Sequence, residues 1–79
     1  MTIQEKFGLR VKELRLERKL SQEQLANVAD IDRTYMTSLE NGKRNVSLKN
    51  IEKILIALNV DVVEFFDAQL FQNGKKKKK

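Results

Sequence analysis

The stretch LSQEQLANVADIDRTYMTSLENGKRN covers residues 20–45 of this 79-residue chain. It is the part of the sequence from which the fold can best be predicted. Ser21 and Gln24 have the spacing of a capping box, which predicts that a helix begins directly after Ser21. The apolar stripe of that helix, at 3.6-residue spacing, consists of Leu25, Val28 and Ala29. The run Asp30-Ile31-Asp32 interrupts the stripe, so we expect the helix to end there.

Asp32 is a favourable N-cap and predicts a second helix that begins at Arg33. Asn41-Gly42 ends it, because glycine readily takes the left-handed conformation that follows many helices. The stretch therefore predicts two short helices joined by a tight turn.

The second helix has two different faces. Met36 and Leu39 lie on one face and can pack inward. The other face, at i, i+1, i+4, i+5 and i+8, holds Arg33, Thr34, Thr37, Ser38 and Asn41. Hydroxyl, amide and guanidinium groups bond base edges or phosphates. A solvated helix face usually carries Glu–Lys pairs instead, and this face has none. Nucleic-acid binding and a plain solvated face both remain open from the pattern alone.

Three further helices are expected around this pair. One covers residues 4–19, a second follows the N-cap Ser47 over residues 48–58, and a third runs from Val62 towards Phe71 after the N-cap Asp61. The stripe that should place the second of these in the core consists of Leu48, Ile51, Ile54, Leu55 and Leu58. The expected fold class is all-α, with five helices in one domain over residues 1–71 and a disordered tail over 72–79.

Composition limits the possible functions. Five of the 16 basic residues are Lys75 to Lys79, and the other 11 balance the 11 acidic residues, so the body of the chain is neutral. The lysine run is either native or a cloning addition. Local charge is more informative, because basic residues cluster between Arg33 and Lys49. With no cysteine or histidine, disulfides and His-based metal sites are excluded, and no metal or cofactor is expected. The absence of a long apolar run and of a signal peptide favours a cytoplasmic protein without membrane contact.

The stretch SQEQLANVADIDRTYMTSLENG resembles the helix-turn-helix of lambda-repressor-like, or Xre-type, transcriptional regulators. The matching positions are Gln22, Leu25, Ala26, Ala29, Ile31, Met36, Leu39, Glu40, Asn41 and Gly42. The overlapping run DRTYMTSLENGKRNVSL resembles more closely the controller proteins of restriction–modification systems, which are small dimeric regulators. The resemblance covers about residues 7–66. It departs from the family at Asp30, where glycine is usual, so the turn is expected to be slightly strained.

The resemblance implies roles for individual residues. It implies an ion pair between Arg15 and Glu40, and a phosphate contact for Gln22 at the start of the first motif helix. Together with the helix pattern, it predicts base contacts from Arg33, Thr34, Thr37 and Ser38. Contacts with the DNA backbone are expected from Gln22, Tyr35, Asn41, Lys43, Arg44, Asn45 and Ser47.

The last predicted helix has more apolar surface than one small domain needs. Its clustered apolar residues predict a dimer interface formed by Val62, Val63, Phe65 and Phe66. The alternative is that these residues only close the core of a monomer.

The expected function is that of a homodimeric regulator of transcription on a palindromic double-stranded operator, with half-sites about 34 Å apart. The resemblance to controllers implies activation at low concentration and repression at high concentration of its own promoter, with no small-molecule effector. A general Xre-type repressor of a phage or mobile element, or an antitoxin that contacts a protein toxin, remains possible. An enzyme is not expected, because capping explains Ser21, Asp30, Asp32 and Ser47 and no catalytic group is left.

Overall fold

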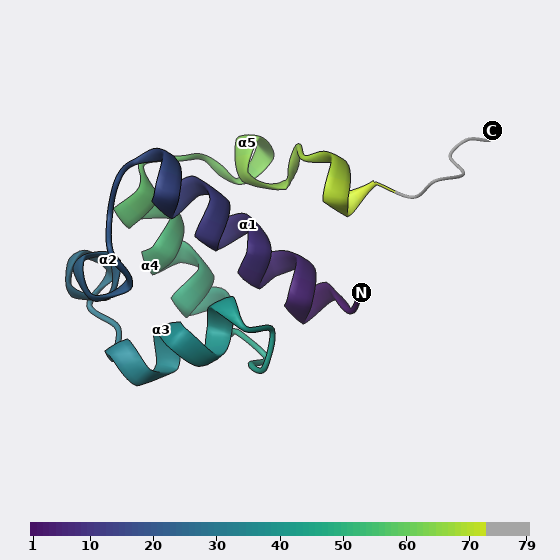
Figure 1. Cartoon of the computed structure of the whole chain (residues 1–79). Coiled ribbons are helices and arrows are strands. Elements are labelled where there is room, and N and C mark those ends of the chain that lie inside the picture. The colour runs from purple at the N-terminus through teal and green to yellow at the C-terminus, as the bar shows by residue number, and fades with distance from the viewer. Residues whose placement is uncertain (73–79) are drawn as a thin grey trace, which may run out of the picture.

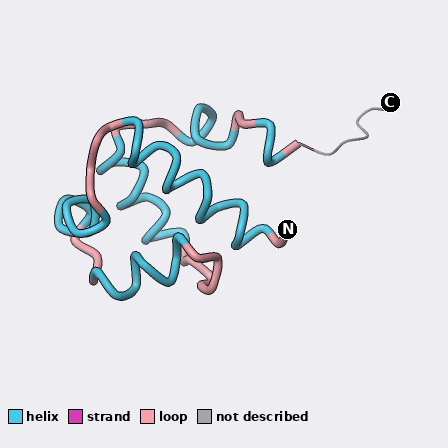
Figure 2. The backbone as a smooth tube through the Cα atoms, in the orientation of Figure 1, coloured by secondary structure: helices cyan, strands magenta, loops and turns pink. Residues whose placement is uncertain are grey.

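The computed structural model describes residues 1–72, which form five α-helices and a final 3₁₀ turn (Figure 1). The helices are α1 (Ile3–Glu17), α2 (Gln22–Ala29), α3 (Arg33–Glu40), α4 (Leu48–Leu58) and α5 (Val62–Phe66), and the 3₁₀ turn covers Gln69–Phe71. Figure 2 shows only helices and loops in the part of the chain that is described. The all-α prediction is confirmed. The predicted tail lies outside the described residues except for Gln72.

Local side-chain bonds determine where each α-helix begins. A side-chain oxygen accepts a hydrogen bond from the third backbone N–H of its helix at each of Thr2, Ser21, Asp32, Ser47 and Asp61. The last four caps were predicted. Thr2 was not, and it forms a full capping box with Glu5. The Thr2 backbone N–H donates to the Glu5 carboxylate and lowers its pKa.

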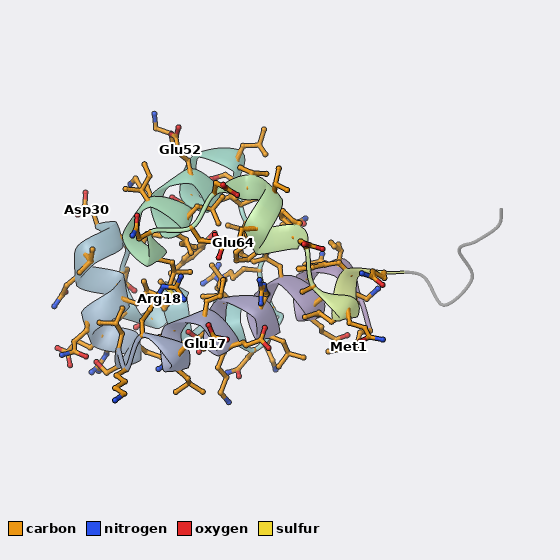
Figure 3. The ribbon with its side chains drawn as sticks, turned by 90° about the horizontal axis from the view of Figure 1, so that it is seen from above. Met1, Glu17, Arg18, Asp30, Glu52 and Glu64 are labelled. Carbon is orange, nitrogen blue, oxygen red and sulfur yellow. The ribbon has the colours of Figure 1, made fainter. Side chains whose placement is uncertain are left out.

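The first four helices end in the same way, with one residue in the left-handed conformation. These residues are Lys19 (φ 58°), Asp30 (φ 58°), Gly42 (φ 76°) and Asn59 (φ 56°). At each end the N–H of the following residue reaches back five residues to a helix carbonyl, as in a Schellman motif. Figure 3 shows Asp30 at the outer corner where α2 ends. The predictions that helices end at Asp30 and at Asn41-Gly42 are confirmed. Lys19 was wrongly placed inside a helix, which in fact ends at Glu17.

Helices α1 and α4 lie in the middle of the molecule, with α3 on one side and α5 on the other (Figure 1). The fully buried side chains between them include Val11, Leu25, Met36, Leu39, Ile54, Leu58 and Phe65. Two predictions about the core were wrong. Val28 is 64% exposed and Leu48 is 84% exposed, because each lies at the edge of its helical stripe.

The C-terminal element is shorter than predicted. α5 ends at Phe66 instead of running towards Phe71, because Asp67 leaves the helical conformation at ψ 70°. Arg10 of α1 holds this short helix: its Nε donates to the Phe65 carbonyl oxygen at 2.7 Å and its Nη2 to that of Glu64 at 2.9 Å. Arg18 does the same for α4 through the Leu58 carbonyl at 2.5 Å (Figure 3). The bonds to Phe65 and Leu58 satisfy helix-end carbonyls that would otherwise lack a partner, whereas the Glu64 carbonyl also accepts from the Asp67 N–H at 3.3 Å.

Candidate nucleic-acid interface

Helix α3 separates a buried face from an exposed face, as predicted. Met36 and Leu39 are 0% and 1% exposed, and they anchor the helix on the core. The opposite face is exposed at Arg33, Thr34, Thr37 and Asn41 and half-buried at Ser38. A polar helix face with short side chains allows the helix backbone to approach a groove of the duplex closely.

Arg33 stands at the first turn of α3, at the start of the polar face. Its Nη1 lies 3.5 Å from the Glu23 Oε1 of α2, and both side chains are about two-thirds exposed (66% and 64%). An ion pair this exposed contributes little, so the guanidinium remains available to a stronger acceptor. A guanine edge or a phosphate offers such an acceptor.

Tyr35 is half-buried against the core, and the guanidinium carbon of Arg44 lies 5.0 Å from the centre of its ring. This cation–π contact joins α3 to the loop that follows it. Tyr35 therefore packs its ring on the domain while lying beside the basic loop.

A chain of polar contacts connects α1, α2 and α3 behind the exposed face. The Arg15 Nε donates to the Glu40 Oε2 at 2.7 Å, and its Nη2 donates to Oε1 at 3.1 Å. The Gln22 Nε2 donates to the same Oε1 at 3.0 Å, and the Thr37 hydroxyl donates to the Gln22 Oε1 at 2.9 Å. The ion pair that the resemblance implied is present, and both of its side chains are buried. The link onward through Gln22 to Thr37 was not foreseen, because it depends on how three helices pack.

The loop after α3 supplies the positive charge of this face. Lys43, Arg44, Asn45 and Ser47 are all exposed, and Ser47 caps the start of α4. Among the described residues, neither Lys43 nor Arg44 forms an ion pair, since the neighbouring Glu40 is bound to Arg15. Asn45 accepts a hydrogen bond from Gln4 at 3.3 Å, which ties the loop to α1. Unpaired cations beside a helix N-terminus provide a surface suited to phosphate.

A second surface of interest lies on α4 and α5, away from α3. Phe65 was predicted to lie in an interface, but it is fully buried, because it packs on Phe7 at 5.1 Å between ring centres. Val62 (59% exposed), Val63 (77%) and Phe66 (36%) remain on the surface. Two residues that sequence reasoning missed join them: Leu48 and Ile56, at 84% and 73% exposed. The exposure of Ile56 could have been predicted from the sequence, because this residue lies off the core stripe of its helix.

Four of these side chains, Leu48, Ile56, Val62 and Phe66, help to line a groove of about 480 Å³ between α4 and α5, whereas Val63 does not line it. Its lining is mostly apolar, with Glu52 and Asp61 as the acidic members. We call the exposed apolar residues of these two helices the α4–α5 face and define it as Leu48, Ile56, Val62, Val63 and Phe66. An apolar face of this kind on a small domain is typical of a protein–protein contact.

Other kinds of site find no support in the described part of the chain. Residues 1–72 hold no group of three or more acidic side chains placed to bind a metal ion. No helix among them is both long and apolar enough to cross a bilayer.

Comparison with known families agrees with this geometry. The helix-turn-helix family profile matches residues 11–65, which is more than half of the chain. The chain belongs to the helix-turn-helix family. The matched range contains the whole α2–α3 pair and the polar face of α3. It also contains α4 and most of α5.

Controller proteins are among the similar members of this family. Control protein C.MunI from a Mycoplasma species is 53% identical over 62 residues, which cover 77% of this chain and 84% of that protein. The crystal structure of the restriction–modification controller protein C.AhdI from Aeromonas hydrophila has a TM-score of 0.77 and 48% identity, covering 80% of this chain and 96% of that one. The tetramer of the controller protein C.Esp1396I in complex with its natural 35 base-pair operator has a TM-score of 0.80 and 36% identity, covering 85% and 88%.

Proposed function

We propose that this chain is a sequence-specific DNA-binding regulator of transcription of the restriction–modification controller type. The observation that carries the proposal is the exposed polar face of α3, anchored by two buried residues and flanked by unpaired cations at Lys43 and Arg44. The operator complex of the similar protein C.Esp1396I supports DNA as the partner.

In this proposal the residues divide into two groups. Those that contact bases are Arg33, Thr34, Thr37 and Ser38. Those that contact the DNA backbone are Gln22, Tyr35, Asn41, Lys43, Arg44, Asn45 and Ser47. The first group lies along α3 itself, and most of the second lies in the loop and helix start beside it. Backbone contacts fix the register of the protein, and base-edge contacts provide the preference for a sequence.

We further propose that the chain acts as a homodimer through the α4–α5 face. That face presents several large apolar side chains to solvent, and a second copy would cover them by symmetry. Two copies related by a two-fold axis require a palindromic operator with half-sites about 34 Å apart. The proposal includes control of its own promoter in the cytoplasm, with activation and repression set by occupancy. No catalytic role is proposed, since the candidate serine and aspartate side chains serve as helix caps.

Selection of binding sites from random duplex DNA tests the proposal. We expect a symmetric motif, bound by two chains, from a version of the protein that ends at Asn73. The omission of the lysine run removes a source of sequence-independent affinity. A result with weak, salt-sensitive binding and no enriched motif would overturn the proposal and favour a protein-binding role such as that of an antitoxin.

A further inference from the structure

The hydrogen bonds behind α3 fix which kind of base edge Thr37 can bind, and they begin at Glu40. The Glu40 carboxylate is buried and accepts from Arg15 at 2.7 and 3.1 Å and from Gln22 at 3.0 Å. A carboxylate held in an ion pair with a guanidinium is ionised and only accepts hydrogen bonds. The Gln22 amide must therefore turn its NH₂ group towards Glu40, and its carbonyl oxygen must point the other way.

That carbonyl oxygen determines where the Thr37 proton goes. The Thr37 Oγ1 lies 2.9 Å from the Gln22 Oε1 and 3.1 Å from the backbone carbonyl oxygen of Arg33. Both neighbours are acceptors, and a hydroxyl has one proton to donate. The proton is therefore used within the protein, whichever of the two oxygens takes it. Because Thr37 is exposed, the lone pairs of its oxygen remain open to solvent and to DNA.

We propose that Thr37 is a specificity-determining residue that accepts a hydrogen bond from an exocyclic amino group, the adenine N6 or the cytosine N4. These amino groups are the hydrogen-bond donors that base pairs present in the major groove. The other polar atoms there are acceptors: guanine O6 and N7, adenine N7 and thymine O4. Each would need a hydrogen bond from the Thr37 hydroxyl, whose one proton is already donated to an acceptor within the protein. The inference rests on the proposed function and names the chemistry of one of its base contacts.

The arrangement gives α3 two contacts of opposite polarity, one helical turn apart. Arg33 only donates hydrogen bonds and suits an acceptor edge. Thr37, four residues later on the same face, suits a donor edge. Glu40 lies behind the exposed face and touches no DNA, yet through Gln22 it sets the polarity of the Thr37 contact. Glu40 and Gln22 are in this sense positioning residues.

Three proteins test the inference in site selection: the wild type, Thr37→Val and Thr37→Ser. Valine keeps the branched shape of threonine and removes the hydroxyl, whereas serine keeps the hydroxyl and removes the methyl group. We expect Thr37→Val to lose preference by about fivefold at one base pair in each half-site, which corresponds to one neutral hydrogen bond. Thr37→Ser should keep that preference. Thermal melting followed by circular dichroism confirms that each variant is folded.

Modified bases at the affected pair then separate a donor edge from an acceptor edge. Purine in place of adenine, or 2-pyrimidinone in place of cytosine, deletes the amino group. A 7-deaza purine in the same pair keeps the amino group and deletes the N7 acceptor. We expect the deleted amino group to cost the wild type about fivefold more than it costs Thr37→Val. The 7-deaza base should affect both proteins equally.

Two results would overturn the inference while leaving the proposed function intact. One is a wild-type motif that Thr37→Val selects unchanged. The other is a difference between the two proteins that follows the N7 acceptor and not the amino group. If the wild type selects no motif, the proposed function fails and this inference fails with it.

Discussion

Arg15 and Glu40 form an ion pair with two hydrogen bonds, and this pair joins α1 to the end of α3. The distances are 2.7 Å from Nε to Oε2 and 3.1 Å from Nη2 to Oε1. The Arg15 Nη1 also donates to the Leu20 carbonyl oxygen at 2.7 Å, in the loop before α2. The pair therefore fixes the position of α3 relative to both α1 and α2, and through Gln22 it reaches the exposed polar face of α3.

Removal of one partner from this pair should be costly. Glu40→Ala leaves the buried Arg15 guanidinium without its carboxylate, and we expect the free energy of unfolding to fall by about 3–5 kcal/mol. Urea denaturation measures the change. The double variant Arg15→Met with Glu40→Leu buries no charge and should recover most of the loss. A loss below about 1 kcal/mol for Glu40→Ala would mean that the pair is not structural.

The left-handed residue after α1 offers a stabilising substitution. Lys19 has φ 58°, a conformation that costs a residue with a Cβ about 1 kcal/mol and costs glycine little. Lys19→Gly should therefore raise the free energy of unfolding by about 0.5–1 kcal/mol, as seen in thermal melting. Asp30→Gly should behave similarly, since Asp30 has the same φ. Lys19→Ala is the matched control, because it removes the same side chain but keeps the Cβ, and it should not stabilise.

Gly8 marks the place where α1 approaches the end of α3. A Cβ added there would lie 2.3 Å from the Leu39 carbonyl oxygen and 2.8 Å from that of Glu40. Both atoms belong to the backbone and cannot rotate away. Gly8→Ala should therefore destabilise the fold by about 1–3 kcal/mol in urea denaturation, although alanine is the better helix former. Lys12→Ala, on the exposed side of the same helix, serves as the control and should change stability little. Equal stability of both variants would show that α1 and α3 do not pack this closely.

The proposed dimer makes a prediction about association. Val63 belongs to the α4–α5 face and is 77% exposed, so in the proposed dimer Val63→Glu would bury a carboxylate in the interface without touching the monomer core. We expect this variant to sediment as a monomer at concentrations where the wild type is a dimer, and to bind an operator more weakly. Leu16→Glu changes a similarly exposed apolar residue on α1, at 55%, and should leave the dimer intact. Loss of the dimer in both variants, or in neither, would rule out the α4–α5 face as the interface.

The sequence was informative where structure is determined locally. Caps at Ser21, Asp32, Ser47 and Asp61 depend on residues three positions apart, so the start of each helix could be predicted. The end of α2 at Asp30 could be predicted because the run Asp30-Ile31-Asp32 interrupts the apolar stripe of that helix. The start of α1 at Thr2 had the same kind of signal in the Thr2–Glu5 spacing, and it was overlooked.

Features that depend on packing could not be predicted from spacing. Helical periodicity placed Phe65 and Phe66 in one apolar cluster, but only the position of α5 against Phe7 decides that Phe65 is inside. The bonds from Arg10 to the carbonyls of α5 join residues more than 50 positions apart. The engagement of Gln22 by Glu40 and Thr37 likewise needs three helices in place, so the candidate site was predicted residue by residue but not as a network.

In the proposed complex α3 contacts the bases while the following loop holds the DNA backbone, and two substitutions separate these roles. Affinities of Arg33→Ala and Lys43→Ala are measured on the selected operator and on a scrambled duplex, over a range of salt concentrations. Arg33→Ala should lose most of the preference for the operator. Lys43→Ala should weaken binding to both duplexes alike and reduce the salt slope by about one unit. An equal loss of preference in the two variants would contradict this division between helix and loop.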